Sequence, residues 1–595
     1  MNTFFYRAMR YVTPILLLAG VTYAQDAVIQ RAMRDEMQRN VKNLHLDTIA
    51  APYFITYSID DGQELSVNAT LGGLLDSTTQ HSRLFDVDVR IGSPKFDNTN
   101  FFSVGEGSGL RFSGGIEGTT LEDNYDALRR DLWIATDAAY KTAIEDLSKK
   151  KAAFENQTHT EDTIDFIETA PYTKDYPPDS FTFEKARWVK LVRSLSAIFE
   201  HYPEIQSSKT SIVLKNDESY YLNSEGSENT QPSHFVRITV TASTQASDGM
   251  PLSDFVSYNV PLPSDLPSDD AMKSAVDSMA RRLTALRAAP VMDEYTGPVI
   301  FTGQASAEVF AQVFGDAMCS IRRPATDNPQ MQFALQMLAP ESPYANRIGS
   351  RILPDGFMVQ DKPDENAING VPTIGGAPID DEGVPEQDVT LVDHGIMKTL
   401  LTCCTPHKKF ATTNGHAWGI PARPAITNLI ITDNKGESVS DLKSTLIEQC
   451  KARGLDYGVM ITRLASPNIY NEADNDNGMA IFNRFFGGDG ASEKITSPIV
   501  AYKVYTDGHE ELVRGIQISG IGISDFKEML AGGNEPYVYN TIIKTKSMQS
   551  FFSPFVVKPA TIAAPSVLFD ELSLKRNEGP FKKLPVVPSP LIGSR

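Results

Sequence analysis

The sequence has few of the features that most directly reveal a function. Its 595 residues include only four cysteines and nine histidines. No two histidines are three or four positions apart, so the chain shows no local histidine-based metal site. A GxSxG elbow, an HExxH helix, a P-loop and a GxGxxG turn after a strand are all missing. Because these local motifs are absent, a catalytic or metal site in this chain would have to be assembled from residues that are distant in the sequence.

Positive charge is also scarce. The chain has 55 Lys and Arg residues against 75 Asp and Glu residues, which gives a formal net charge of −20. An acidic surface repels phosphate backbones, and no dense basic patch with interleaved aromatic residues is present, so we expect no direct nucleic-acid binding. The 41% hydrophobic and 22% charged residues are typical of a globular protein, and the length predicts two or more domains.

The cysteines are too few for a disulfide framework in a chain of this length. Cys403 and Cys404 are adjacent, and two adjacent residues of a strand point to opposite faces. We therefore expect buried free thiols. A disulfide between Cys319 and Cys450 is the alternative, although nothing in the sequence supports it.

Long apolar runs are absent beyond the N-terminus, where a short one follows two basic residues. Arg7 and Arg10 precede the apolar run 12–21, and Ala24 supplies the small residue of a cleavage site. This pattern predicts a signal peptide over residues 1–24 and an exported protein, periplasmic or secreted. An N-terminal membrane anchor is the alternative. No later segment is long and apolar enough for a transmembrane helix.

Hydrophobic periodicity divides the remaining chain into two parts. Residues 25–290 combine long helical patterns with alternating strands, which predicts an α+β domain of long helices on antiparallel strands. Within it, Asp60-Asp61-Gly62 and Asn216-Asp217 predict the turns of two hairpins. Residues 291–595 have mainly strand patterns and predict a β-rich C-terminal domain with one helix at its front.

That helix is the amphipathic stretch AEVFAQVFGDAM, residues 307–318. Its apolar face is followed by a polar stripe, because Glu308, Gln312 and Asp316 recur every four residues. The stripe is either a solvated face or part of a site.

Three polar clusters further along the chain are also candidates. Asp380, Asp381 and Glu382 could coordinate a hard cation, although such a run commonly begins a polar turn. Asn414 and His416 belong to a Gly/Asn/Thr-rich loop that presents polar groups either to a cleft or to bulk solvent. The stretch FNRFFGGDG can supply tight backbone turns near a ligand or form an ordinary hairpin turn.

Several segments of the second half together resemble the TldD/PmbA family, whose members are often labelled modulators of DNA gyrase. The resemblance extends over approximately residues 290–595 and is weaker, though compatible, before them. Order and spacing match in the segments YTGPVIFTGQASAEVFAQVFGDAM, GSRILPDGFMVQDKP, APIDDEGVPEQDVTLVDHGIMKTLL, TTNGHAWG and AYKVYTDGHEELVRGIQISGIGISDFKEMLAGG.

The resemblance implies a metallopeptidase-type scaffold. Active members carry an H-E-x-x-x-H helix after a GPV strand; its histidines bind zinc, its glutamate activates water, and a later cysteine completes the site. Carried over without gaps, these three positions fall on Ala311, Gln312 and Asp316. Ala311 has no donor atom, and the Gln312 amide cannot take a proton from water. No cysteine follows Cys450. The motif is therefore degenerate, and we expect no zinc cofactor.

The sequence thus favours an exported, zinc-less pseudoenzyme of the TldD/PmbA type. PmbA-like subunits also lack the motif and pair with TldD-like ones. The resemblance therefore implies a non-catalytic partner or peptide-binding subunit in proteolysis or peptide maturation, as a homodimer or a heterodimer with a TldD-like subunit.

Two alternatives remain. One is an active hydrolase with a non-standard site drawn from Asp316, Asp380, Asp381, Glu382 and His416. The other is a structural or binding protein of the cell envelope. For peptide binding, we expect Gln312 and Asp316 to face a groove shared with the candidates of the two loops, namely Asp380, Asp381, Glu382, Asn414 and His416.

Overall fold

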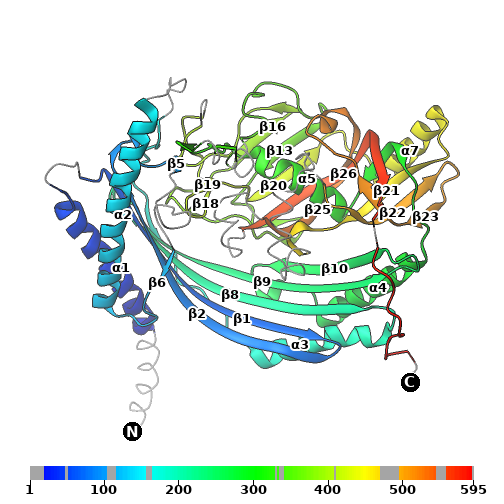
Figure 1. Cartoon of the computed structure of the whole chain (residues 1–595), viewed down its shortest axis with the longest axis horizontal. Helices are drawn as coiled ribbons and strands as arrows, with labels where there is room; N and C mark the ends of the chain where they lie inside the picture. The colour runs from blue at the N-terminus through cyan, green and yellow to red at the C-terminus, as the bar shows by residue number, and fades with distance from the viewer. Residues whose placement is uncertain are drawn as a thin grey trace, which may run out of the picture.

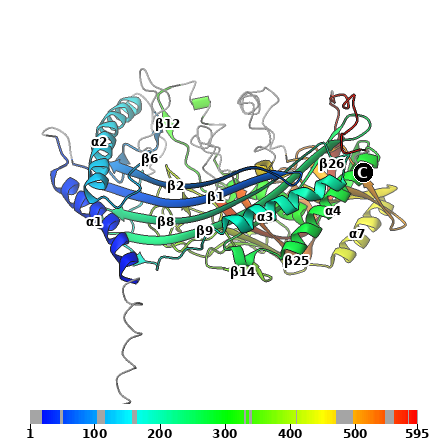
Figure 2. The ribbon, with the colours of Figure 1, turned by 90° about the horizontal axis from the view of Figure 1, so that it is seen from below.

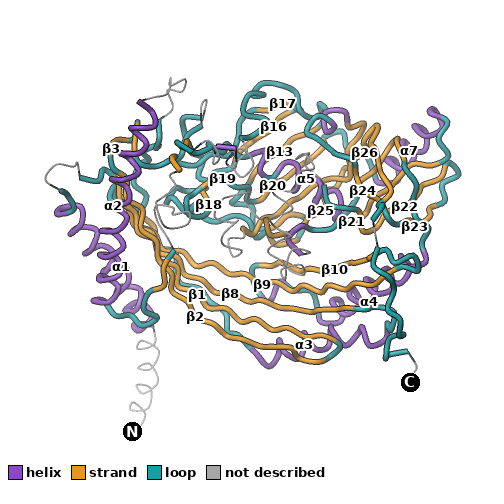
Figure 3. The backbone as a smooth tube through the Cα atoms, in the orientation of Figure 1, coloured by secondary structure: helices purple, strands orange, loops and turns teal. Residues whose placement is uncertain are grey.

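The computed structural model describes residues 19–46, 51–102, 116–155, 164–328, 332–333, 335, 341–407, 410–469, 495–543, 558–579 and 581–592. Most of the predicted signal peptide (residues 1–18) and the stretch FNRFFGGDG (482–490) lie outside these ranges. The described part is organised around two large sheets (Figures 1 and 3). One is built from strands before residue 261 and the other from strands between 295 and 576. The predicted α+β class is confirmed.

The first sheet has the strand order β10-β9-β8-β1-β2-β6, and these neighbours are antiparallel. Its curved strands run beneath the C-terminal body in Figure 1. The short β7 is parallel to β9. The bounds are β1 (Phe54–Thr70), β2 (Gly73–Arg90), β6 (Glu117–Gly118), β7 (Thr173–Asp175), β8 (Ser207–Asn223), β9 (Glu228–Gln245) and β10 (Pro251–Val260).

The two hairpin turns predicted inside this sheet are wrong. β1 runs through Gly62 without a break and reverses only at Leu71-Gly72, and β8 likewise continues through Asp217. The two turn-like segments are neighbours, because Gly62 is paired with Asp217. A Cβ atom added to Gly62 would lie 2.5 Å from Asp217 Oδ1. Glycine here makes room for a side chain of the next strand.

Side chains of the long strands alternate between the two faces of the sheet. Ile55, Tyr57 and Ile59 of β1 pack on α1 (Ala19–Asn43) and α2 (Tyr125–Glu155). Farther along the same face, Leu65 and Val67 join the core formed with α3 (Lys185–Ser196) and α4 (Asp269–Ala288). The helices therefore cover one face (Figure 2), and the opposite face is turned toward the C-terminal body.

The second sheet is mixed, with the order β17-β16-β13-β20-β26-β11-β21-β22-β23, and β24 and β25 also pair with β26. β11 runs parallel to β21, and β20 runs parallel to β26. Its bounds are β11 (Tyr295–Phe301), β13 (Phe357–Asp361), β16 (Val389–Asp393), β17 (Ile396–Met397), β20 (Asn428–Asp433), β21 (Tyr457–Leu464), β22 (Pro498–Tyr505), β23 (Glu510–Val513), β24 (Ile516–Ile518), β25 (Met529–Ile543) and β26 (Lys558–Arg576).

Two helices cover opposite faces of this sheet. α5 (Gln304–Phe314) packs with Val299 and Phe301 of β11, whereas α7 (Val439–Arg453) packs with the intervening Ile300. The predicted helix 307–318 is therefore confirmed up to Phe314, after which Gly315 leads into a 3₁₀ turn, Asp316–Met318. No helix of the described ranges is both long and apolar enough to cross a lipid bilayer.

Short pairs of strands and 3₁₀ turns complete the described structure. The strands are β3 (Gly92–Ser93), β4 (Phe96–Asp97), β5 (Phe101–Phe102), β12 (Ala325–Thr326), β14 (Ala367–Ile368), β15 (Val371–Pro372), β18 (Ala417–Trp418) and β19 (Arg423–Pro424). The other 3₁₀ turns are Ala197–His201, Pro263–Asp265 and Asp525–Glu528.

A buried carboxylate joins the two halves of the molecule. Asp254 of β10 is fully buried, and its two oxygens contact Arg282 of α4 at 2.5 Å and Arg463 of β21 at 3.1 Å. Nearby, the side-chain amides of Asn259 and Asn540 each donate to the other residue's carbonyl oxygen at 2.9 Å. These bonds fix β10 against the second sheet.

Replacing Asp254 by alanine should weaken this junction. The substitution leaves two guanidinium groups without their shared buried partner, and we expect a loss of about 3–5 kcal/mol of folding stability. Urea denaturation followed by tryptophan fluorescence measures the change. Asp137→Ala is the control, because it removes an exposed pair with Lys141 and should cost about 0.5 kcal/mol. Equal urea midpoints for the two variants would contradict the assigned role of Asp254.

Candidate functional site

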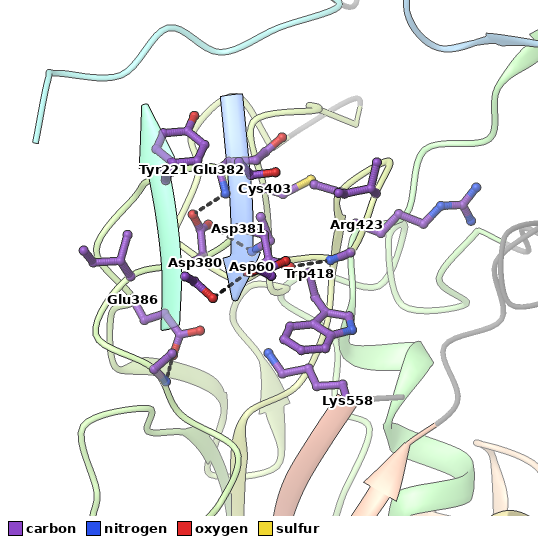
Figure 4. Close-up of a pocket in the computed structure, with 18 of the residues that line it drawn as sticks. Asp60, Tyr221, Asp380, Asp381, Glu382, Glu386, Cys403, Trp418, Arg423 and Lys558 are labelled. Carbon is purple, nitrogen blue, oxygen red and sulfur yellow. Dashed lines mark hydrogen bonds between the residues drawn. The ribbon is translucent and has the colours of Figure 1, made fainter. Parts of the chain in front are cut away.

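A cavity of about 980 Å³ lies between the first sheet and loops of the C-terminal half (Figure 4). The sheet supplies one wall through β1, β2, β8 and the start of β9. The opposite wall comes from the loops around residues 372–386, 403–405 and 417–424, together with Lys558. The site is thus assembled from segments that are hundreds of residues apart.

The sheet wall is polar because of the two-residue period of the strands. Thr56, Ser58 and Asp60 of β1 face the cavity, whereas the residues between them belong to the helix-covered core. In β2 the same alternation turns Asp86 and Asp88 to the cavity. The wall therefore carries carboxylates and hydroxyl groups on a rigid antiparallel framework.

The loop wall is held in place by the carboxylate of Asp380. Its Oδ1 accepts hydrogen bonds from the backbone N–H groups of Glu382 (3.0 Å) and Val384 (2.9 Å). Its Oδ2 accepts one from Ala417 N at 3.0 Å, which ties this loop to β18. Asp381 in turn accepts a bond from Gly419 N at 2.6 Å. The acidic run predicted as either a ligand set or a polar turn is a turn, and it also lines the cavity.

Close packing sets this loop against the sheet. Gly383 has φ +77°, and a Cβ atom there would lie 2.3 Å from the ring of Tyr221 on β8. Only glycine combines this backbone conformation with this approach. The contact brings Asp381 and Glu382 to the edge of the sheet wall, as Figure 4 shows beside Asp60 and Tyr221.

Acidic residues outnumber basic ones around the cavity. Its described lining holds ten Asp and Glu residues against five Lys and Arg residues. Most of the cations already have anionic partners: Arg90 contacts Asp88 at 2.9 Å, Lys215 contacts Glu64 at 3.1 Å, and Arg322 contacts Asp165 at 3.0 Å. The cavity therefore has a surplus of negative charge.

Burial acts on these carboxylates and disfavours their charged form. It raises the pKa of Asp86 and of Glu386 to about 7, and the pKa of Asp217 and of Asp381 to about 6. Neighbouring acids add to the effect: Asp88 raises the pKa of Asp86, and Asp60 raises that of Asp381. Several carboxylates of one cavity thus change charge near neutral pH.

Several buried polar atoms of the lining have no hydrogen-bond partner in the described structure. They include Asp86 Oδ1, Ser320 Oγ, Trp418 Nε1 and Arg423 Nη1. Buried polar atoms of folded proteins are nearly always paired. The cavity therefore offers both donors and acceptors to a ligand.

The polar stripe of α5 does not reach this cavity. Gln312 Nε2 donates to Glu308 Oε1 at 2.8 Å and to Thr496 Oγ1 at 2.7 Å, while its Oε1 accepts from Thr496 N at 3.0 Å. Glu308 is itself buried, and burial raises its pKa to about 7. The stripe is an internal hydrogen-bond network, and the expected groove shared by Gln312 with the two loops is not found among the described lining residues.

The remaining candidates are placed away from the cavity surface. Asp316 lines a separate void of about 10 Å³ with Cys319 and Lys558. Asn414 accepts a bond from Thr402 N at 2.8 Å, which holds its loop. His416 is fully buried, with Nε2 3.4 Å from Asp361 Oδ1. Of the sequence candidates, Asp380, Asp381 and Glu382 alone are brought together along the cavity.

The residues at the degenerate motif do not fit a zinc ion. Ala311 offers no donor atom, Gln312 is committed to its neighbours on both ends of its amide, and Asp316 is a single carboxylate. Within the described ranges, no three His, Cys, Asp or Glu side chains are grouped so that they could hold a metal ion. All four cysteines are buried and free, as expected.

Comparison with known proteins agrees with this architecture. A sequence model described as the PmbA/TldA metallopeptidase C-terminal domain matches residues 294–576. A metalloprotease PmbA homolog from Haemophilus influenzae is 29% identical over 111 residues, and the match covers 16% of this chain and 24% of that relative. The chain thus matches about a quarter of the length of this curated relative.

Solved structures show the same fold over nearly the whole chain. A proposed modulator of a DNA gyrase from Thermotoga maritima has 15% identity and a TM-score of 0.55, covering 88% of this chain and 96% of that one. TldE from Thermococcus kodakarensis has 12% identity and a TM-score of 0.55, covering 91% and 100%. A proposed modulator of DNA gyrase from Bacteroides thetaiotaomicron has 12% identity and a TM-score of 0.55, covering 93% and 98%.

The C-terminal half is therefore a domain of the metallopeptidase-related type. Residues 294–576 match a C-terminal domain of the TldD/PmbA family, so the resemblance to this family that the motifs predicted is confirmed.

Sequence reasoning missed the sheet wall of the cavity. Asp60 and Asp217 were assigned to turns, and Asp86 was not singled out. A usable signal is present in RLFDVDVR, where Phe85, Val87 and Val89 alternate with acidic and basic residues. Such a strand has one face in a core and one polar face.

The titration of Asp86 predicts a pH-dependent effect of Asp86→Asn. The pKa of Asp86 is about 7 in the folded chain and about 3.9 in an unfolded one, so the carboxylate opposes folding once it ionises. Its contribution is most favourable below about pH 4 and is lost as the pH rises through about 7. We therefore expect the folding stability of the variant, measured relative to that of the natural chain, to increase by about 1–3 kcal/mol when the pH is raised from 5 to 8.

Urea denaturation at the two pH values tests this expectation. Asp76→Asn is the matched control, because Asp76 lies on the same strand but is exposed. A stability difference between Asp86→Asn and the natural chain that stays constant with pH would refute the assigned environment of Asp86.

Proposed function

We propose that this protein is a zinc-less member of the TldD/PmbA family that binds peptides and does not cleave them on its own. The observation that carries the proposal is the separation of two features. The helix that holds zinc in the resembling peptidases is here an internal packing element, with Gln312 bonded to Glu308 and Thr496. The large polar cavity lies elsewhere, against the first sheet.

The cavity has properties suited to a peptide segment. Its volume is at the upper end of the range of about 300–1,000 Å³ for small-molecule sites. It presents unpaired donors, such as Trp418 Nε1, and unpaired acceptors, such as Asp86 Oδ1. A peptide chain carries both donors and acceptors along its backbone. Ser58 and Tyr221 from neighbouring parts of the sheet add further polar and aromatic contacts.

Two further parts of the proposal concern location and assembly. The basic and apolar N-terminal pattern of residues 1–24 supports export to the periplasm or the exterior. The likeness to TldE and to a PmbA homolog supports assembly with a second subunit of the family. In such a pair a TldD-type subunit with an intact motif would supply hydrolysis, and this chain would hold peptide.

Elemental analysis and a peptide-binding assay test the proposal together. We expect the purified chain to contain less than about 0.1 zinc per molecule, because one carboxylate and an amide do not form a tight zinc site. A library of mixed peptides should raise its melting temperature without being cleaved, because ligands that bind only the folded state stabilise it. Stoichiometric zinc that survives dialysis would overturn the proposal, as would hydrolysis by the pure chain.

A steric variant checks that the cavity is the binding site. Ser58→Trp places a large ring in the cavity and should abolish the peptide-induced shift in melting temperature. Thr78→Trp is the control, since Thr78 is exposed on β2 away from the cavity. Equal shifts in the two variants would place peptide binding outside the cavity.

A further inference from the structure

We infer that the cavity selects peptides carrying a cationic group, a Lys or Arg side chain or an amino terminus, and that Asp86 is the counter-ion of that group. The inference rests on the proposed peptide binding and assigns a specificity to it. It begins with a carboxylate that the fold buries without an opposite charge.

Asp86 is 7% exposed and belongs to the lining of the cavity. Its Oδ1 atom has no hydrogen-bond partner in the described structure. The charged groups with the largest effects on its pKa are Asp88, Asp60 and Glu117, and these three are acidic. A backbone hydrogen bond from Val87 favours the ionised carboxylate, but burial and the neighbouring acids outweigh it, and a bound cation would stabilise the ionised form.

Two cations of the cavity, Arg90 and Lys558, are engaged with other groups. Arg90 contacts Asp88 and also lies 4.2 Å above the ring centroid of Phe166. Lys558 lies 5.0 Å from the ring centroid of Trp418, directly below that ring in Figure 4. Its ammonium lowers the pKa of Glu386 against the larger effect of burial. No cation is among the groups with the largest effects on the pKa of Asp86.

Two further carboxylates, Asp60 and Asp381, extend the preference for a cationic group along the wall of the cavity. Asp60 of β1 accepts a hydrogen bond from Ser219 of β8 at 2.6 Å and faces Asp381 of the loop. Each of the two acids thus has one bond to a neutral donor, Ser219 or the N–H of Gly419. A peptide with a positive charge therefore meets acceptors beyond Asp86, whereas an acidic peptide meets repulsion.

An organic cation suits this geometry better than a metal ion. The carboxylates are spread along the sheet and the loop, and in the described ranges they do not form a group of three that could hold a metal. A guanidinium or ammonium needs only one or two acceptors at hydrogen-bond distance, and its aliphatic stem packs on aromatic lining such as Tyr221.

Matched capped pentapeptides test the selection by calorimetry at pH 8. The probes are acetyl-Ala-Ala-X-Ala-Ala-amide with X as arginine, its neutral isostere citrulline, or glutamate. We expect the arginine peptide to bind at least tenfold more tightly than the citrulline peptide, and the glutamate peptide to bind most weakly. Asp86→Asn should reduce the arginine-over-citrulline ratio at least fivefold. Asp76→Asn should leave the ratio unchanged.

The outcomes separate this inference from the proposed function. Equal affinities for arginine and citrulline peptides would overturn the inference and leave peptide binding intact. A full arginine preference in Asp86→Asn would overturn the role of Asp86. Absence of binding by every peptide, with Ser58→Trp equally inert, would overturn the proposed function itself. Because Asp86→Asn is expected to be more stable than the natural chain at this pH, a loss of its preference reports recognition and not misfolding.

Discussion

Two arginines from distant parts of the chain, Arg282 and Arg463, meet on the one buried carboxylate of Asp254. Removing the carboxylate would leave both guanidinium groups without their shared anionic partner, so the position of both arginines depends on Asp254. Because Asp254 belongs to β10 and Arg463 to β21, this contact fixes the first sheet against the second. The cavity exists only between these two parts, and its shape depends on their relative position.

The helix α5 is held in the fold by packing on one face and by hydrogen bonds on the other. Phe310 and Phe314 pack with Phe526 in a tilted and edge-to-face aromatic cluster, with ring centroids 4.9–5.3 Å apart. On the other side of the helix, Gln312 is bonded to a buried glutamate. Both faces of the helix are therefore committed to the interior. Its position in the fold is maintained by packing, independently of any catalytic use.

The predictable part of this structure is the part encoded by local periodicity and by family motifs. The helices of the first domain, the helix beginning near Ala307 and the acidic loop Asp380–Glu382 were all visible in the sequence. The hydrogen bonds of Gln312 could not be predicted, because its partner Thr496 is 184 positions away in the sequence. The sequence placed an amide at the position where the resembling family carries a base, but it could not show that this amide bonds to Glu308 and Thr496.

The turns predicted at Asp60-Asp61-Gly62 and Asn216-Asp217 were wrong for a different reason. Local sequence rules read polar residues and glycine as a chain reversal, since that is their commonest setting. Here they stand in the middle of two 17-residue strands, where the polar face is turned to a cavity. Only the tertiary pairing of Gly62 with Asp217 distinguishes the two cases. The error fell on the candidate site because the polar residues of these two segments line the cavity.

The alternation along β1 and β2 also limits how this chain can change in length. Inserting one residue before Ser58 would turn Ile59 toward the cavity and Asp60 toward the helices, because every later side chain of the strand would exchange faces. An insertion of two residues would preserve the faces and merely shift the register. Homologues should therefore differ in β1 and β2 by even numbers of residues or by changes at the Leu71-Gly72 reversal. The lengths of β1 and β2 in a family alignment would therefore indicate which residues of these strands face the cavity.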